Sequence, residues 1–214
     1  MLCTDRSHGD LSGDWVRAHL GGVPCTTLSQ MHGAEVVVVQ RPGDKEGAQA
    51  DAAVSVAGGL ALAVRVADCV PIGLASPEGA FGVVHAGWRG LAGGVVEAAV
   101  GALRALGASR VEAVVGPCVH AECYPFGTAD IAPLVERYGS GVASHDRHGN
   151  PALDLPGAVR LALTGCMVDL VGQLDVCTAC SEQHWSWRAR GDLARQGLVA
   201  WKPGDTEGPV TWKV

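Results

Sequence analysis

Short apolar runs separated by Gly or Pro make up most of the first half of the chain. The β-branched run at 36–39 is long enough for a buried strand. After a polar loop at 41–50, the pattern predicts further strands joined by brief turns, at 52–56, 60–66, 72–75 and 81–84. Residues 1–29 predict mainly loop, with a short helix near 15–20. The first half is therefore expected to be rich in strands.

From residue 91 the apolar spacing becomes helical. Ala, Leu and Val recur at helical intervals over 91–106, and Gly107 provides a stop. A strand at 111–115 precedes helices at 128–138, where Thr128 is a suitable N-cap, and at 156–170, where Pro156 suits the first turn. Strands follow at 174–178, 197–202 and 210–213. Without an internal repeat or a long linker, the pattern predicts one α/β domain, residues 1–214, with a mixed sheet.

Composition narrows the class of protein. A chain of 214 residues with 48% hydrophobic residues can bury a full core, and no apolar run approaches the roughly 20 residues that span a bilayer. The start of the chain lacks a basic stretch followed by an apolar one, so we expect a cytoplasmic protein whose eight cysteines are thiols. The net charge of −6, without a basic patch, predicts a small-molecule partner and neither nucleic acid nor membrane.

Three short segments each place a metal-type ligand at an end of a predicted strand. His32 lies in Gln-Met-His-Gly, Cys69 in Ala-Asp-Cys, and His85 in His-Ala-Gly-Trp-Arg-Gly. Each alone has an ordinary interpretation: a surface histidine, a buried structural cysteine and a loop histidine. Together they are the donor set of a catalytic zinc site with an open position. Without a metal, Cys69 and His85 would form a nucleophile and base pair.

Neighbouring residues add candidates of lower specificity. Asp68 could orient a ligand histidine or cap a turn, and Arg89 could hold phosphate near a helix start or form a surface salt bridge. The lone C-x-x-C motif at 177–180 has no second motif and does not start a helix, so we assign it neither zinc nor redox chemistry. Cys118 and Cys123 bracket a Gly-Pro loop and could line the same site, but neither is assigned as a ligand.

In order along the chain, the motifs Gln-x-His-Gly, Ala-Asp-Cys-x-Pro-Ile, His-Ala-Gly-Trp-Arg-Gly and Gly-Pro-Cys-x-x-x-x-Cys-Tyr resemble those of the laccase-domain family, long labelled multicopper polyphenol oxidase. The likeness extends from these motifs to Asp51-Ala52, Leu153-Asp154-Leu155, Cys177-Thr178 and Ser186-Trp187-Arg188, and so spans nearly the whole chain. The resemblance implies a three-layer α/β/α fold with a mixed sheet and a zinc site formed by His32, Cys69 and His85.

The same resemblance implies purine nucleoside chemistry: phosphorolysis of adenosine, inosine and methylthioadenosine, with deamination of adenosine. Zinc is then the cofactor, and a purine nucleoside and phosphate are the partners. A metal-activated water suits attack at C6 of adenine. Cys69, His85 and Asp68 are the candidate catalytic residues.

For substrate and phosphate, the candidates are Arg89 and Arg65, on charge alone, and Gln30. Copper is the metal that the older family label suggests. The eight histidines include no His-x-His pair, however, which argues against a multicopper oxidase.

The chain departs from the family pattern in several places. The region before His32 looks shortened, and Glu122, Pro125 and Ala189 stand where the family usually has Cys, Glu and Arg. Metal binding is therefore the firmer expectation, and substrate choice the weaker. Two other hypotheses stay open: a metal-free Cys-His hydrolase or amidase, for instance acting on cell-wall precursors, and a catalytically inactive nucleoside-binding module.

Overall fold

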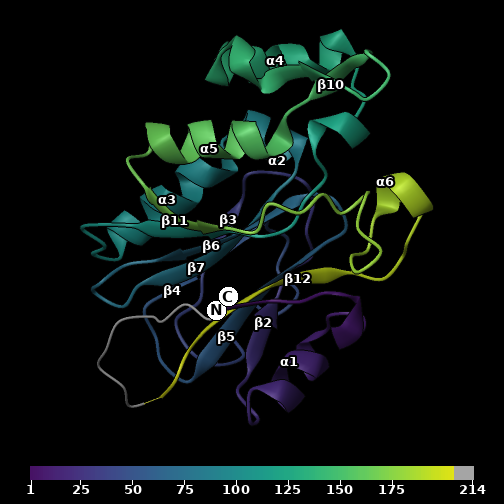
Figure 1. Cartoon of the computed structure of the whole chain (residues 1–214). Coiled ribbons are helices and arrows are strands. Elements are labelled where there is room, and N and C mark those ends of the chain that lie inside the picture. Colours follow the sequence, from purple (N-terminus) through teal and green to yellow (C-terminus); the bar gives the residue numbers. More distant parts are fainter. Residues whose placement is uncertain (205–214) are drawn as a thin grey trace.

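Two β-sheets packed face to face form the centre of the protein (Figure 1). The computed structural model describes residues 1–204. The larger sheet has the strand order β11-β8-β6-β7-β4-β3, with bounds Asp169–Gln173, Glu112–Val115, Val70–Ala75, Phe81–Ala86, Ala52–Ser55 and Val36–Val38. The smaller has the order β1-β12-β5-β2, with bounds Leu2–Cys3, Gln196–Lys202, Leu60–Val66 and Cys25–Thr27. A separate hairpin pairs β9 (Ala143–His145) with β10 (Pro151–Leu153).

Both the larger and the smaller sheet are mixed. The pairs β3–β4, β8–β11 and β2–β5 are parallel, and their other neighbouring strands are antiparallel. Every residue of β4, β6 and β7 is buried. Covered on both faces, these strands consist of continuous apolar runs instead of alternating ones.

Helices cover the outer faces of the paired sheets. Against the larger sheet lie α2 (Trp88–Gly93), α3 (Val95–Ala105) and α5 (Leu155–Gly165), with α4 (Thr128–Tyr138) outside them. Against the smaller sheet lies α1 (Gly13–His19). The remaining helices are short: α6 (Trp187–Arg190) and the 3-10 turns η1 (Arg6–His8), η2 (Ala121–Cys123) and η3 (Ser140–Val142). None of the helices in residues 1–204 is long and apolar enough to cross a membrane.

The expected mixed α/β domain is confirmed, with a different layering. Three buried clusters fill the spaces between helices and larger sheet, between the two sheets, and between smaller sheet and α1. The layers are therefore helix, sheet, sheet, helix, and not the α/β/α order that the resemblance implied. The strand at 60–66 supplies one reason: it pairs with β12 on one side and with β2 on the other, and β12 pairs in turn with β1, so these four strands form a sheet of their own.

Several elements differ from the expected ones. The helix expected at 91–106 begins at Trp88 and is divided by Gly94, which is left-handed with φ 85°. The helix expected at 156–170 ends at Gly165, and 169–173 forms β11 where a strand was expected at 174–178. The run at 36–39 forms a half-buried edge strand. The pattern missed β1, β2 and the β9–β10 hairpin, and the strand expected at 210–213 lies outside the described residues.

Candidate metal centre

His32, Cys69 and His85 come together at one point. Each offers one ligand atom, and these three atoms lie within 4.8 Å of one another. His32 stands in the loop before β3, Cys69 in the turn between β5 and β6, and His85 on β7. Because β6 and β7 pair with Val70 opposite Ala86, the turn before Val70 is held beside the end of β7. The two imidazole rings meet edge to face, with centroids 4.8 Å apart.

Asp51 anchors both histidines. Its buried carboxylate lies 2.7 Å from Nδ1 of His85 and accepts the backbone N–H groups of Met31, His32 and Gly33 at 3.2, 2.9 and 2.7 Å. Burial acts to raise the pKa of Asp51, but the hydrogen bonds from His85 and Gly33 hold it below its usual value. An ionised Asp51 fixes the His85 ring with Nε2 as the nitrogen free for a metal.

Cys69 and His85 form a thiolate and imidazolium pair. Burial acts to raise the pKa of Cys69, but the charge of His85 and the hydrogen bonds from His32 and His85 lower it to about 6. Burial likewise acts to lower the pKa of His85, but the Cys69 charge and the Asp51 hydrogen bond raise it to about 9. At neutral pH the metal-free centre therefore holds a nucleophilic thiolate beside a protonated histidine.

This pair predicts a pH dependence for zinc binding. A zinc ion must displace the proton from Nε2 of His85 between pH 6 and pH 9, and also the Cys69 proton below pH 6. Apparent zinc affinity should therefore rise about tenfold per pH unit between pH 6 and 9, and more steeply below 6. Calorimetry in buffers of different ionisation enthalpy counts the released protons. Binding at pH 7.5 without proton release would contradict the assignment of His85.

Gly87 closes one side of the centre. A Cβ atom on this residue would lie 3.1 Å from both Cys69 Sγ and His32 Cδ2, and 3.9 Å from His85 Cε1. The backbone therefore approaches the three donors as closely as only glycine allows. A thiolate and two imidazoles are donors that zinc prefers, and three such ligands leave a position open. The residues present fit a zinc ion.

Replacing Gly87 with Ala is expected to displace Cys69 or His32 by a few tenths of an ångström. We expect weaker zinc retention on dialysis against a chelator, because ligand geometry sets the affinity. Gly101→Ala is the matched control, since a Cβ atom at that helical glycine meets nothing within 4 Å. Equal zinc retention in the two variants would contradict a tight centre at Gly87.

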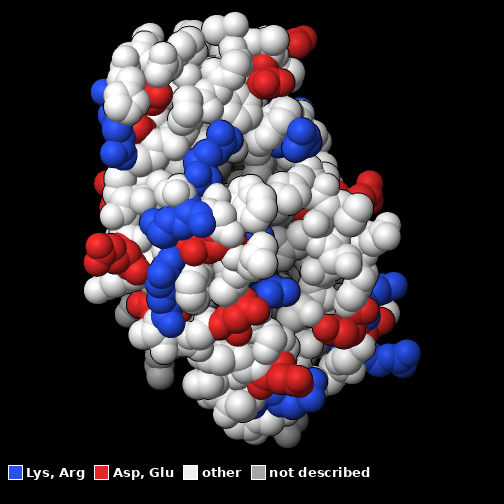
Figure 2. All heavy atoms as spheres, turned by 90° about the vertical axis from the view of Figure 1, so that its right-hand side faces the viewer, with Lys and Arg blue, Asp and Glu red and all other residues white. Residues whose placement is uncertain are grey.

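A cavity of about 590 Å³ opens over the centre. Aromatic and basic side chains line it: Trp88, Tyr124, Trp187, Arg65, Arg89, Arg188 and Arg195. Figure 2 looks onto the side of the molecule that carries α6, where basic side chains lie around a hollow in the middle of the face. A basic cavity with aromatic walls suits an anionic ligand together with a flat ring.

The four arginines differ in what they bind. Arg65 lies 3.2 Å from Asp10, and Arg195 donates to the carbonyl groups of residues 192–194. Arg89 and Arg188 form no ion pair with any carboxylate in residues 1–204 and instead lie over the rings of Trp88 and Tyr124, at 4.4 and 4.7 Å. These two guanidinium groups are the cations in the cavity that remain available to an anion.

Gln30 and Asp68, both candidates from the sequence, line the cavity but bind elsewhere. The Gln30 amide donates to the Arg65 carbonyl at 2.7 Å and accepts from the Arg65 N–H at 2.8 Å. Asp68 accepts from the Thr178 hydroxyl and the Arg188 N–H, each at 2.7 Å. The carboxylate that hydrogen-bonds to His85 is therefore Asp51, and of the two roles left open for Asp68, orienting a ligand histidine is not the one that its own hydrogen bonds support. The catalytic role of Asp68 stays a prediction.

Asp51 was identified from the sequence only as part of the Asp51-Ala52 motif, although its position in the chain indicates a buried, paired carboxylate. It is a single carboxylate in the run of small apolar residues at 50–54, and its side chain is fully buried. A charge in a buried strand pattern indicates a paired group. Arg188 likewise stood only within the Ser186-Trp187-Arg188 motif, and no local pattern assigned it to the cavity, because a helix of four residues far along the chain brings it there.

Comparisons with known proteins identify relatives of this chain. Residues 14–202 match the family described as Multi-copper polyphenol oxidoreductase laccase. Proteins named purine nucleoside phosphorylase from Streptomyces coelicolor and Streptomyces griseus are each 39% identical, over 81% and 86% of this chain and 73% and 77% of their own. The crystal structure of YlmD from Geobacillus stearothermophilus superposes with a TM-score of 0.79 at 26% identity, covering 88% of this chain and 77% of that one. The chain therefore belongs to the Multi-copper polyphenol oxidoreductase laccase family.

Proposed function

We propose that this protein is a zinc-dependent purine nucleoside phosphorylase that also deaminates adenosine. The observation that carries the proposal is a three-donor centre, His32, Cys69 and His85, beneath a cavity where two arginines have neither a carboxylate nor a carbonyl partner among residues 1–204. The names of the Streptomyces relatives support phosphorolysis. The donor set supports zinc, because a thiolate with two imidazoles leaves an open position.

In phosphorolysis, the side chains that line the cavity would have two distinct roles. A phosphate oxygen attacks C1′ of the ribose, the bond from C1′ to N9 breaks, and the purine leaves with a proton. Arg89 and Arg188 would hold the phosphate by charge-assisted hydrogen bonds and set its direction of attack. Trp88, Tyr124 and Trp187 offer ring faces against which a purine can stack. This arrangement uses the base and the phosphate as two separate anchors.

Deamination assigns the centre its role. Zinc, when bound, supplies Lewis acidity, which activates water for attack on C6 of adenine. Asp51 binds Nδ1 of His85, which leaves Nε2 as the ring nitrogen available on the side of Cys69 and His32. Water adds at C6, the amino group leaves as ammonia, and inosine remains. The family description names copper instead of zinc. Metal analysis of the protein tells which of the two ions these donors hold.

Product analysis tests the proposal directly. Zinc-loaded protein with adenosine and phosphate is expected to yield adenine with ribose 1-phosphate, and inosine with ammonia. Cys69→Ala should lose the zinc of this centre and both activities, while Cys25→Ala, a buried cysteine on β2, should keep them. Protein that holds zinc and gives none of these products would overturn the proposal.

A metal-free cysteine hydrolase is the second candidate. It is favoured by the lowered pKa of Cys69, about 6, beside a protonated His85, as in a nucleophile and base pair. Zinc analysis separates the two hypotheses. An active protein without zinc that is inactivated by thiol alkylation at Cys69 would support the hydrolase. Zinc at one ion per centre, lost together with activity, supports the phosphorylase.

A further inference from the structure

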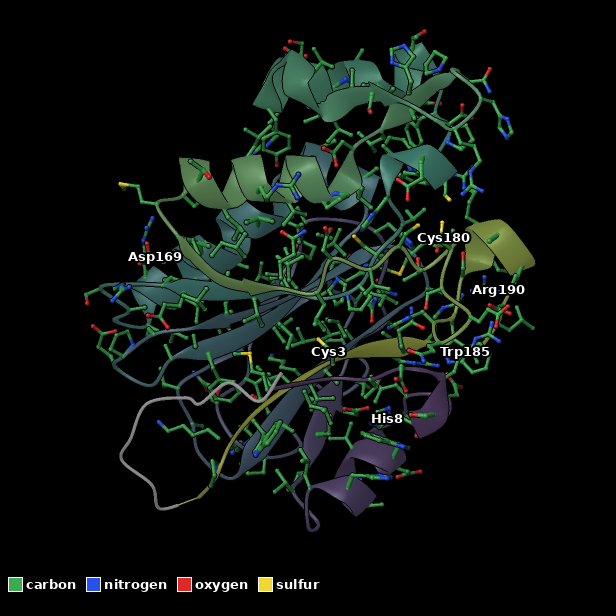
Figure 3. All side chains as sticks on the ribbon, in the orientation of Figure 1. Cys3, His8, Asp169, Cys180, Trp185 and Arg190 are labelled. Carbon is green, nitrogen blue, oxygen red and sulfur yellow. The ribbon has the colours of Figure 1, made fainter. Side chains whose placement is uncertain are left out.

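A second group of metal-type donors lies outside the centre described above. Glu122, Cys123, Cys177 and Cys180 each offer one ligand atom, and these four atoms lie within 4.8 Å of one another. Glu122 and Cys123 belong to η2, whereas the two other cysteines stand in the loop between β11 and α6. Figure 3 labels Cys180 in this loop, next to α6. Cys123 Sγ and Cys180 Sγ are 3.3 Å apart.

The backbone builds this group. Cys118 and Cys177 form a parallel bridge, in which the Thr178 N–H donates to the Cys118 carbonyl at 2.9 Å, so the two loops are tied side by side. The N–H groups of Cys180 and Ser181 donate to the Cys177 carbonyl at 3.2 and 3.0 Å. This turn folds the C-x-x-C segment back on itself, which brings its two sulfur atoms to the same side. The donors are therefore placed by main-chain hydrogen bonds.

Two further contacts suit sulfur atoms that carry negative charge. The His120 N–H donates to Cys177 Sγ at 3.5 Å. The Arg147 guanidinium contacts Cys123 Sγ and lies 3.4 Å from Cys180 Sγ, while its Nε donates to the Glu122 carbonyl at 3.2 Å. Three thiolates and a carboxylate with a divalent ion leave an excess of about two negative charges, of which Arg147 offsets one. A cation here also stabilises thiolates.

We propose that Glu122, Cys123, Cys177 and Cys180 bind a zinc ion in a closed, four-coordinate structural site. Three sulfur donors and one carboxylate oxygen match zinc, and four protein ligands leave no position for a substrate. A disulfide between Cys123 and Cys180 would involve only two of the four donors. It would not explain why Cys177 and Glu122 lie beside them. The zinc would join η2 to the loop before α6.

The position of the site gives it a role in the cavity. Tyr124, which lines the cavity, directly follows Cys123, and Thr178, which directly follows Cys177, donates to Asp68 beside Cys69. Zinc bound here would fix the backbone next to Tyr124 and next to Thr178. It would thereby stiffen one wall of the cavity without touching a substrate.

Zinc content of single variants tests the proposal. The whole protein, purified under reducing conditions without chelator, is expected to lose about one zinc ion per chain on Cys180→Ser, relative to the unchanged protein, because three ligands no longer close the site. Cys166→Ser is the matched control, since this partly exposed cysteine lies in neither donor group. Cys69→Ser should retain this zinc, so failure of the proposed function and failure of this site are distinguishable.

Cobalt substitution provides a readout that does not depend on the stability of Cys180→Ser. Glu122→Cys adds a fourth thiolate and should strengthen the sulfur-to-cobalt absorption bands, whereas Glu122→Gln should weaken cobalt retention. Equal zinc content in Cys180→Ser and the unchanged protein would overturn the proposal. So would a Cys123–Cys180 disulfide, found by mass spectrometry without reductant, in protein whose Glu122→Cys variant shows unchanged cobalt bands.

Discussion

Replacing Asp51 with Asn is expected to lower the zinc affinity of the His32, Cys69 and His85 centre by about 10- to 100-fold, the usual effect of losing the partner of a ligand histidine. The carboxylate serves four donors: the His85 ring and three backbone N–H groups. An amide has one acceptor oxygen, and its NH₂ group repels the N–H groups that face it. The ring of His85 and the loop of His32 would both lose their fixed orientation.

Zinc competition with a chromophoric chelator measures the affinity, and circular dichroism checks the fold. Asp154→Asn is the matched control, because Asp154 also accepts a backbone N–H, at 2.8 Å, but at the start of α5. Asp51→Ala should be more severe, since each buried N–H left without an acceptor costs about 1–3 kcal/mol. An Asp51→Asn protein with unchanged zinc affinity would show that His85 needs no partner.

Replacing Arg89 or Arg188 with Ala is expected to raise the KM for phosphate by about 10- to 100-fold, because a hydrogen bond to a charged group contributes about 1.5–3 kcal/mol. Adenosine deamination needs no phosphate, so its rate should change much less. The predicted result is therefore a large loss of phosphorolysis together with a small change in deamination. It arises because these guanidinium groups have no carboxylate partner within residues 1–204 and are available to phosphate.

Two variants control for charge and position. Arg89→Lys keeps the charge but loses the bidentate fork, so it should recover only part of the phosphate binding. Arg104→Ala removes a cation on α3 that donates to the Cys166 carbonyl, outside the cavity, and should leave both reactions unchanged. If phosphorolysis and deamination fell equally in Arg89→Ala and Arg188→Ala, phosphate would have to bind elsewhere.

The convergence of His32, Cys69 and His85 could be predicted from the sequence because these residues flank strands that the apolar pattern identifies. The runs at 60–66 and 81–84 match β5 and most of β7, and their ends carry Cys69 and His85. The spacing of apolar residues predicts which segment is a strand, however, but not which strands pair with it in a sheet. The separation into two sheets depends on the pairing of β5 with β12 and β2, which no local pattern encodes.

Other parts of the site could not be predicted because they depend on contacts between distant segments. From the sequence, Asp68 could orient a ligand histidine or cap a turn, but its backbone is left-handed, with φ 100°, and its side chain hydrogen-bonds to Thr178 and Arg188. The C-x-x-C motif looked isolated because Glu122 and Cys123 lie more than 50 positions earlier. Folding, and not sequence spacing, assembles such groups.

The left-handed turn at Asp68 has an energetic consequence. Its carboxylate holds the backbone of Arg188, and its own backbone leads into Cys69. A ligand that binds Arg188 and one that binds Cys69 therefore act on a single strained residue, whose conformation is maintained by Thr178 and Arg188. Thermodynamic linkage makes such an effect reciprocal. If an anion at Arg188 tightens zinc at Cys69, zinc must tighten that anion by the same factor.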